Sequence, residues 1–404
     1  MANVPCTGES TIELPVSPNA RREWSYNEMR ELGIKTMGKR ACLAQMKVAQ
    51  ALYCKRKDVV AVAPTGFGKT LAFFLALFMA VEDGLSEGVT IVTPLNALGE
   101  QNTAALKAMG VTAIAINGST KSEETYKDVG RGKYRVVVIS PELAAEKAFL
   151  SIIEDPAYQA RQLYIVVDEA HCVSRWGRTF REDYLSVGNL RDFMPNTIPF
   201  CVVSATLAPP ILRDVIALLG LRHNKLEKII LSNDRSNIAL LVRPMAHSMS
   251  SYKDLAFLLP HPDDPIQPVK KFLVFVDSRE VAEDIVDFFD RRLPPEHVGK
   301  ILYYHASMTD AWRRDACEGL RSGRIWGLIV TDAFGMGMDL PDIEFIVQWS
   351  IPSDIDTLWQ RFGRAARDFA LSAIALLLVE KGELDLARTT AAIAASVRSK
   401  SKSK

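Results

Sequence analysis

The stretch Ala63-Pro-Thr-Gly-Phe-Gly-Lys69-Thr70 is the feature that most constrains the fold of this chain. An apolar run at 59–62 precedes it and an apolar segment at 71–81 follows it, which is the strand, loop and helix order of a phosphate-binding loop. Gly66 and Gly68 let the backbone turn tightly and point its N–H groups at anionic oxygens, and the following helix adds its N-terminal dipole. Lys69 offers a positive charge to the β- and γ-phosphates, and Thr70 offers a hydroxyl to Mg²⁺. The stretch therefore predicts a nucleotide site with Mg²⁺, and a glycine turn beside a chance Lys-Thr pair is the alternative.

A second stretch, Ile165-Val-Val-Asp168-Glu169-Ala170-His171, ends an apolar run with two carboxylates. Side chains at the carboxyl end of a parallel strand face the ligand crevice of the sheet. Asp168 is placed to hold Mg²⁺, and Glu169 to orient a water molecule for attack on the γ-phosphorus. An acidic turn after a strand is the alternative reading, and the phosphate loop upstream argues against it.

Composition narrows the class of protein without naming it. The 404 residues are 48% hydrophobic and 24% charged, enough for about two domains with their own cores. The net charge is +1, so a nucleic-acid surface would have to be a local patch. We expect no signal peptide, because the first 20 residues lack a basic start with an apolar core, and no membrane span, because the apolar runs are too short. Six cysteines without CxxC spacing predict buried thiols in a reducing compartment and no zinc site.

Strand-like runs alternate with helical or loop segments along most of the chain. This order predicts an α/β protein made of two domains, each a parallel sheet covered by helices. We expect a mobile lead-in at 1–25, a first domain at 26–235, a second domain at 236–385 and a basic tail at 386–404. The expected strands are 59–62, 89–93, 111–116, 136–140, 163–167 and 200–204, then 272–276, 301–304, 326–330, 345–348 and 373–379.

The order of further motifs resembles one family in particular. The segment Cys172-Val-Ser-Arg-Trp176-Gly-Arg-Thr-Phe180-Arg181-Glu-Asp-Tyr184 follows the Asp-Glu-Ala-His stretch directly. It resembles the aromatic-rich loop of the RecQ family, DNA helicases of superfamily 2 with a DEAH box. The other first-domain matches are Gln45 (adenine-reading glutamine), Thr93-Pro94-Leu95 (motif Ia), Ser140-Pro141-Glu142 (motif Ib), Ser204-Ala205-Thr206 (motif III) and Asp234–Ile238 (the junction).

The second half carries the remaining motifs of that family. Residues 272–278 resemble motif IV, the run from Thr331 to Asp339 resembles motif V, and Gln360-Arg361-Phe-Gly363-Arg364-Ala-Ala-Arg367-Asp368 resembles motif VI. The resemblance spans about residues 28–380 and implies two tandem RecA-like domains. It also implies catalytic roles for Lys69, Asp168, Glu169, His171, Arg364 and Arg367, and nucleotide-binding roles for Gln45, Thr65, Gly66, Gly68, Lys69, Thr70 and Asp339.

Arg364 and Arg367 would reach the triphosphate from the second domain and stabilise charge in the transition state. In the aromatic loop, Trp176 and Phe180 could stack on unpaired bases and Arg181 could hold a phosphate. A loop that tucks its aromatic rings into a domain interface is the alternative. The resemblance implies DNA contacts at Thr93, Pro94, Ser140, Ser204, Thr206 and Thr331, most of them to phosphate and sugar.

The resemblance implies an ATP-dependent DNA helicase or translocase that moves 3′→5′ on single-stranded and partly duplex DNA. Nothing after Asp368 supplies the spaced cysteines of the family's zinc-binding region, so we expect the helicase core alone, without zinc or membrane. A monomer is expected, although the sequence does not fix the oligomeric state. Two other functions stay open: an RNA helicase or RNP remodeller, and a DNA-binding or annealing protein with weak unwinding. The compartment would be the nucleus in a eukaryote and the cytoplasm otherwise.

Overall fold

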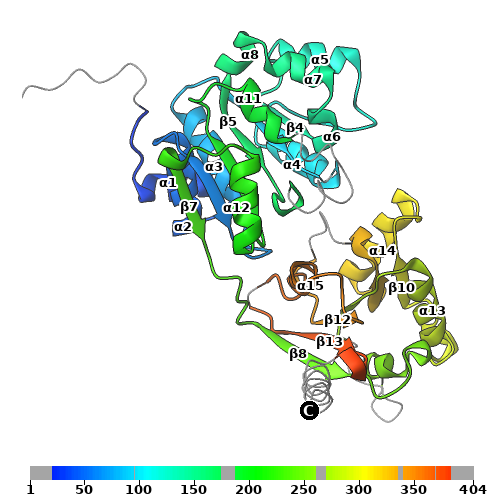
Figure 1. Cartoon of the computed structure of the whole chain (residues 1–404). Helices are drawn as coiled ribbons and strands as arrows, with labels where there is room; N and C mark the ends of the chain where they lie inside the picture. Colours follow the sequence, from blue (N-terminus) through cyan, green and yellow to red (C-terminus); the bar gives the residue numbers. More distant parts are fainter. Residues whose placement is uncertain are drawn as a thin grey trace, which may run out of the picture.

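Two lobes, each built on one sheet, make up the protein, which is described here by a computed structural model (Figure 1). The structure describes residues 21–94, 96–173, 187–260, 270–334, 340–368 and 370–383. Within these ranges the first sheet has the strand order β3-β4-β2-β5-β6-β1-β7 and the second β10-β11-β9-β12-β13-β8. Every pair of neighbouring strands is parallel. The predicted fold class is therefore confirmed.

The first lobe covers its sheet with helices on both faces. Its strands are β1 (Asp58–Val62), β2 (Gly88–Val92), β3 (Ala113–Ile116), β4 (Val136–Ile139), β5 (Gln162–Val167), β6 (Phe200–Ser204) and β7 (Leu226–Ile230). Its helices are α1 (Tyr26–Met37), α2 (Leu43–Tyr53), α3 (Lys69–Glu82), α4 (Asn96–Ala108), α5 (Glu123–Gly130), α6 (Pro141–Ala144), α7 (Lys147–Ile153), α8 (Pro156–Ala160), α11 (Leu190–Phe193), α12 (Pro209–Leu218), and the 3₁₀ turns η1 (Val187–Asn189) and η2 (His223–Lys225).

The second lobe follows the same plan. Its strands are β8 (Ile238–Pro244), β9 (Phe272–Phe275), β10 (Ile301–Tyr304), β11 (Gly327–Val330), β12 (Phe345–Trp349) and β13 (Ala373–Val379). Its helices are α13 (Arg279–Asp290), α14 (Asp310–Ser322) and α15 (Ile355–Phe362), with the 3₁₀ turns η3 (Met249–Ser251), η4 (Lys253–Leu258), η5 (Pro295–His297), η6 (Asp332–Phe334) and η7 (Lys381–Glu383).

Both faces of the central strands of each sheet are buried, which is why those strands are continuous apolar runs. Along β1, Val59 and Ala61 join the core on one face, while Val60 and Val62 join the core on the other. The strand β9 divides its side chains in the same way between the two cores of the second lobe. Carboxyl ends of parallel strands share one edge of a sheet, so the loops after β1, β5 and β6 are brought together there.

Two edge strands, β7 and β8, were not predicted. β7 pairs only with β1, and β8 pairs only with β13, within the described residues. After Ile238 the side chains of β8 are exposed, with Leu240, Leu241 and Val242 showing 47%, 49% and 62% of their surface. An exposed edge strand lacks the buried pattern by which its neighbours are recognised.

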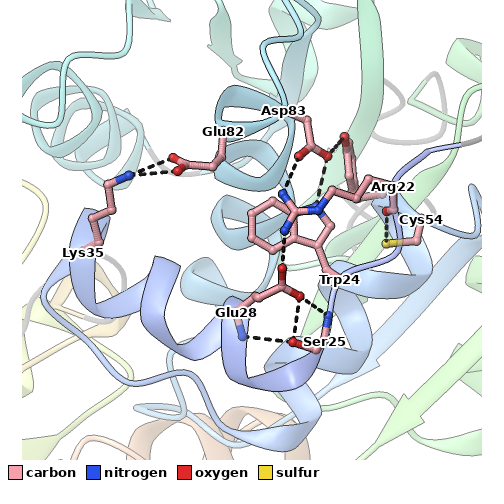
Figure 2. Close-up of polar contacts among 9 residues, drawn as sticks. Arg22, Trp24, Ser25, Glu28, Lys35, Cys54, Glu82 and Asp83 are labelled. Carbon is pink, nitrogen blue, oxygen red and sulfur yellow. Dashed lines mark hydrogen bonds and ion pairs between the residues drawn. The ribbon is translucent and has the colours of Figure 1, made fainter.

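The end of the predicted mobile lead-in is packed against the first lobe (Figure 2). Trp24 is 5% exposed, and its Nε1 donates to Asp83 Oδ2 at 3.0 Å. Tyr53 Oη donates to the same oxygen at 2.5 Å, and Arg22 pairs with Asp83 Oδ1 at 3.3 Å. Ser25 then begins α1 with a capping box formed with Glu28. The expectation of mobility is wrong for residues 21–25, because burying the indole ties them to α2 and α3.

Cys42 is exposed, which corrects the expectation that the cysteines are buried. Cys172, Cys201 and Cys317 are buried as expected. The helices that the structure describes include none long and apolar enough to cross a bilayer. Among the same residues, no three His, Cys, Asp or Glu side chains are grouped to hold a metal ion.

Candidate functional site

The phosphate loop joins β1 to α3 in the predicted place. Gly66 and Gly68 both have a φ of 80°, a left-handed conformation that glycine adopts without strain. Gly68 caps α3, so Lys69 and Thr70 are the first two residues of the helix. Lys69 Nζ donates to the carbonyls of Ala63 and Pro64 at 3.1 and 3.3 Å. The ammonium group thus lies across the loop where phosphate oxygens would bind.

Asp168 and Glu169 lie at the carboxyl end of β5, beside this loop. Asp168 is 8% exposed, and its Oδ1 accepts the Glu169 N–H at 2.9 Å. Burial, followed by the charge of Glu169, raises the pKa of Asp168 well above its ordinary value, while Lys69 acts in the opposite direction. Burial lowers the pKa of Lys69, and Glu169 and Asp168 counteract that effect. The three groups therefore share one desolvated site.

His171 links this site to the second lobe through a chain of hydrogen bonds. Its Nδ1 lies 3.0 Å from Ser204 Oγ and 3.4 Å from Glu169 Oε2. Ser204 Oγ in turn donates to Thr206 O at 2.9 Å. On its other side, His171 Nε2 lies 3.0 Å from Gln360 Nε2 of α15. With that amide donating, His171 carries its hydrogen on Nδ1 and donates toward Ser204.

The second lobe docks directly on the phosphate loop. Thr65 Oγ1 donates to Gly363 O at 2.7 Å, and a Cβ atom at position 363 would overlap that hydroxyl. Arg235, from the segment between the lobes, donates through Nη1 to Thr65 O at 3.1 Å. Its Nη2 donates to Ala366 O at 2.6 Å. One arginine therefore holds the loop of the first lobe and motif VI of the second.

Arg364 and Arg367 lie near the phosphate loop, half-buried, as the residues after α15. A Cβ atom at Gly66 would lie 3.6 Å from Arg367 Cγ. The charges of both arginines contribute to lowering the pKa of Lys69, after burial, so both lie within electrostatic reach of it. Their roles as arginine fingers stay predictions.

The charges of this site fit a nucleotide with its metal ion. Asp168 is buried and the adjacent Glu169 is partly buried. Lys69 alone does not return the pKa of Asp168 to its ordinary value, so further positive charge is favourable there. The amino end of α3 and the glycine loop face the same point and favour anionic oxygens. With only two carboxylates, the other positions of a Mg²⁺ ion would fall to water, the Thr70 hydroxyl and phosphate oxygens.

Gln45 differs from the expectation of an amide open to adenine. The residue is 5% exposed, and its Nε2 donates to the carbonyls of Phe67 and Gly68 at 2.9 and 3.1 Å. Its Oε1 accepts the Cys42 N–H at 2.8 Å. Both the oxygen and the nitrogen of the Gln45 amide are therefore hydrogen-bonded, and the nitrogen holds the phosphate loop at Phe67 and Gly68. Reading adenine would require at least one of these bonds to be exchanged.

The predicted DNA-contacting residues lie at carboxyl ends of strands. Thr93 and Pro94 follow β2, Ser140 follows the neighbouring β4 and caps α6, and Thr331 follows β11 of the second lobe. Thr93 Oγ1 and Thr206 Oγ1 are buried without a hydrogen-bond partner among the described residues. Leu95, Trp176, Phe180, Arg181, Tyr184 and Asp339 lie outside the described residues, so their predicted roles are unchanged.

The sequence analysis missed the contacts of two residues of α15, Gln360 and Arg361. Gln360 was assigned no role, yet it carries the contact with His171. Arg361 is 4% exposed and ties α15 to Gln348 at 2.7 Å, Asp277 at 2.9 Å and Asp332 at 2.9 Å. A buried guanidinium with three partners positions the helix rather than a ligand. No pattern in the sequence marks either residue apart from its place in motif VI.

Known protein families match both lobes. The family described as DEAD/DEAH box helicase matches residues 43–215, and the helicase conserved C-terminal domain matches residues 255–368. Together the two matches cover the phosphate loop, the acid pair Asp168 and Glu169, and motif VI. The chain therefore carries a DEAD/DEAH box helicase domain followed by a helicase conserved C-terminal domain.

Curated relatives place the chain more narrowly. It is 29% identical over 338 residues to the mouse "Bifunctional 3'-5' exonuclease/ATP-dependent helicase WRN", a match that covers 82% of this chain and 23% of that protein. It is 29% identical to a "Probable ATP-dependent DNA helicase RecS" of Bacillus subtilis, covering 82% and 62%. For the "ATP-dependent DNA helicase RecQ" of Haemophilus influenzae the identity is 28%, covering 81% and 49%. The predicted resemblance to RecQ-type helicases is confirmed, and the chain spans less than two thirds of these relatives.

Solved structures agree with the fold. The helicase MrfA bound to DNA matches 90% of this chain and 49% of its own, with a TM-score of 0.69 and 19% identity. S. cerevisiae Dbp5 bound to RNA and ADP BeF3 matches 88% of this chain and 90% of its own, with a TM-score of 0.63 and 18% identity. At this identity the likeness concerns the arrangement of the two lobes.

Proposed function

We propose that this chain is a RecQ-type DNA helicase that moves 3′→5′ and whose ATP hydrolysis is stimulated by single-stranded DNA. The observation that carries the proposal is the connection from the acid pair through His171 to Gln360, together with Gly363 docked on Thr65. A change at the phosphate loop is thereby transmitted to the second lobe. Relative motion of two lobes that each grip a strand is what translocation requires.

In the proposed reaction, the chain binds ATP with Mg²⁺ at the loop, where Thr70 and Asp168 would hold the metal ion. The bound ion would neutralise charge that develops on the transferred phosphate. Lys69 leaves the carbonyls of Ala63 and Pro64 for phosphate oxygens. Glu169 orients the attacking water, and Arg364 and Arg367 stabilise the transition-state charge from the other lobe.

The alternative of an RNA helicase has a specific observation behind it. A relative described as "Putative ATP-dependent RNA helicase R290", from Acanthamoeba polyphaga mimivirus, is 27% identical over 77% of this chain. RNA and DNA share the phosphate backbone, to which most of the proposed contacts go. A binding or annealing protein with weak unwinding is the third possibility, and the complete set Lys69, Asp168, Glu169 and Arg364 argues against it.

The deciding experiment measures ATP turnover with no nucleic acid, with single-stranded DNA and with single-stranded RNA of the same length, at one salt concentration. We expect DNA to stimulate turnover and RNA to do so far less. Lys69→Ala, which removes the charge in the loop, provides the inactive control. Unwinding of duplexes with a 3′ or a 5′ single-stranded tail then tests the direction. Stronger stimulation by RNA, or no stimulation by either, would reject the DNA helicase.

A further inference from the structure

A second hollow lies on the first lobe, at the end of the sheet opposite the phosphate loop. It has a volume of about 920 Å³ and is lined by Arg21, Arg22, Arg56, Arg222 and Lys225, with Asp83 and Glu87 as its two carboxylates. We call it the basal basin. Arg56 lies just before β1 begins and the phosphate loop lies just after β1 ends. A five-residue strand therefore separates the two sites by about 17 Å.

The carboxylates of the basal basin are already neutralised. Asp83 accepts hydrogen bonds from the Arg22 guanidinium and the Trp24 indole (Figure 2). It also accepts one from the Tyr53 hydroxyl. Glu87 pairs with Arg21. Burial, and next the hydrogen bond to Asp83, raises the pKa of Tyr53, so the hydroxyl remains a donor. Neither acid is left to oppose an incoming anion with its full charge.

The remaining cations exceed the acids around them. Behind the basin, Asp58 is fully buried and is shared by Arg191 at 3.0 Å and Arg222 at 2.7 Å. Among the described residues, no carboxylate pairs with Arg56 or Lys225. Arg56 Nη2 donates instead to a backbone carbonyl, that of Thr197, at 3.1 Å. Burial, and after it the charge of Arg21, lowers the pKa of Arg56, while the charge of Glu87 acts in the opposite direction.

The arginines of the basin are held in place before any ligand arrives. Arg222 donates to Asp58 and, at 3.2 Å, to the carbonyl of Arg56. Arg56 itself has a φ of 49°, a left-handed conformation that a residue with a Cβ atom adopts only at a cost. Fixed guanidinium groups present paired N–H donors at a spacing that matches phosphate oxygens. Preorganised donors lose little entropy on binding.

We propose that the basal basin binds the phosphate groups of an anionic ligand, at a site separate from the phosphate loop. Its volume exceeds that of a single phosphate and falls in the range of small-molecule sites. The chemistry is the same whether the phosphates belong to a free oligophosphate or nucleotide or to a nucleic-acid backbone. Binding there requires neither the acid pair nor motif VI, so the proposal stands apart from the helicase reaction.

Pyrophosphate is a suitable probe, and Lys69→Ala is the background that silences the phosphate loop. By calorimetry we expect Lys69→Ala to bind pyrophosphate at one site. Adding Arg56→Ala, or Lys225→Glu on the exposed side of the basin, is expected to weaken that binding tenfold or more, and adding Arg56→Lys to weaken it less. Arg291→Ala removes one charge from a 77% exposed arginine of the second lobe and is the matched control. Circular dichroism checks that each variant is folded.

A short single-stranded deoxyoligonucleotide, titrated separately, distinguishes the two sources of the phosphates, a small compound and a nucleic-acid backbone. If Arg56→Ala weakens binding of both probes, the phosphates are those of a nucleic acid; if it weakens pyrophosphate alone, they are those of a small compound. Absence of pyrophosphate binding to Lys69→Ala would overturn the proposal. So would equal affinities with and without Arg56→Ala and Lys225→Glu, an equal loss in Arg291→Ala, or equally tight binding of an acidic peptide.

Discussion

Glu169 and Ala366 both adopt left-handed backbone conformations although each carries a Cβ atom, with φ of 48° and 37°. Such conformations cost of order 1–3 kcal/mol and persist where surrounding contacts hold them. The Glu169 N–H is held by Asp168 Oδ1, and the Ala366 carbonyl is held by Arg235. One strained residue in each lobe therefore fixes the geometry of the candidate ATP site.

Glu169→Gln keeps the shape of the side chain and removes its ability to act as a base. We expect ATP to bind within about twofold of the wild-type affinity while turnover falls by about 10²–10⁴-fold. Phosphate release gives the turnover, and a fluorescent ATP analogue gives the affinity. Glu154→Gln, an exposed acid after α7, is the control for a changed charge. Normal turnover in Glu169→Gln would show that Glu169 is not the general base.

Gln45→Ala tests the two tasks that sequence and structure give this residue. Its amide holds the carbonyls of Phe67 and Gly68, so its loss should loosen the phosphate loop and weaken ATP binding about tenfold, or about 1.4 kcal/mol. If the amide also reads adenine when nucleotide binds, the preference for ATP over GTP should fall as well. Titration with both nucleotides measures this. Equal losses for ATP and GTP would leave only the loop-holding task.

The sequence predicted the residues of this site better than their contacts. Lys69, Asp168 and Glu169 were recognisable because each follows a strand within a short, ordered motif. The pairing of His171 with Gln360 joins residues 189 positions apart, and it depends on how the two lobes dock. The buried position of Gln45 depends likewise on α2 packing on α3. The local order of side chains along the chain shows neither how the lobes dock nor how α2 packs on α3.

At the scale of elements, the segment after α15 docks on the phosphate loop because residue 363 has no side chain. Gly363→Ala would push a methyl group into Thr65 Oγ1 and break the bond between the lobes. We expect a larger radius of gyration without nucleotide, by small-angle scattering, and a lower turnover with the fold intact. Gly382→Ala, where an added Cβ atom meets nothing within 4 Å, is the matched control. An unchanged radius and turnover would make the contact incidental.

The start of β1 is fixed by an ion-pair cluster. Asp58 accepts bonds from Arg191, Arg222 and the Phe200 N–H. Burial alone would raise the pKa of Asp58, but the hydrogen bonds from Arg222 and Phe200 and the charge of Arg191 hold it below the ordinary value. The carboxylate therefore contributes stability above about pH 4, its unfolded pKa, and loses that contribution as the pH falls through the folded pKa.

Asp58→Asn leaves Arg191 and Arg222 buried without their carboxylate. We expect a loss of about 3–5 kcal/mol in the free energy of unfolding at pH 7, measured by urea denaturation. The difference from wild type should shrink as the pH falls below about 4. Glu227→Gln, which breaks the half-exposed pair with Lys57, should cost no more than about 1 kcal/mol. Equal costs for the two variants, or a difference independent of pH, would contradict the role of the cluster.

Among the described elements, the central strands and the edge strands β3 and β10 were predicted, whereas the edge strands β7 and β8 were not. Val136–Ile139 is apolar throughout because helices cover both its faces. Leu226–Ile230 contains the adjacent charged residues Glu227 and Lys228 and is half-exposed. Ile238–Pro244 ends in Arg-Pro and is exposed along most of its length. Both take their conformation from hydrogen bonds to one neighbouring strand. Such pairing leaves little trace in the order of side chains.

At the scale of the whole molecule, the two lobes meet next to the acid pair, through His171 and Gln360, and the predicted aromatic loop follows His171 directly in the chain. We expect Trp176→Ala to leave unstimulated ATP turnover nearly intact and to remove most of its stimulation by single-stranded DNA. Stacking contributes about 1–3 kcal/mol per base, so DNA affinity should fall only modestly beside the backbone contacts. Turnover is measured against DNA concentration, with binding followed separately. Phe257→Ala, which removes an exposed ring of η4, is the control. Full stimulation in Trp176→Ala would show that the loop serves packing and does not couple DNA binding to ATP turnover.

The pairing of β8 with β13 has a consequence for biosynthesis. β8 is the first strand of the second sheet to leave the ribosome, yet its neighbour in the sheet is the last, roughly 135 residues later. At about 5–20 residues per second, the delay is on the order of ten seconds. During that time Leu240, Leu241 and Val242 belong to a nascent strand with no partner, while the first lobe can already fold. The second lobe is therefore the part of this protein whose production should respond most to chaperones that bind extended apolar segments.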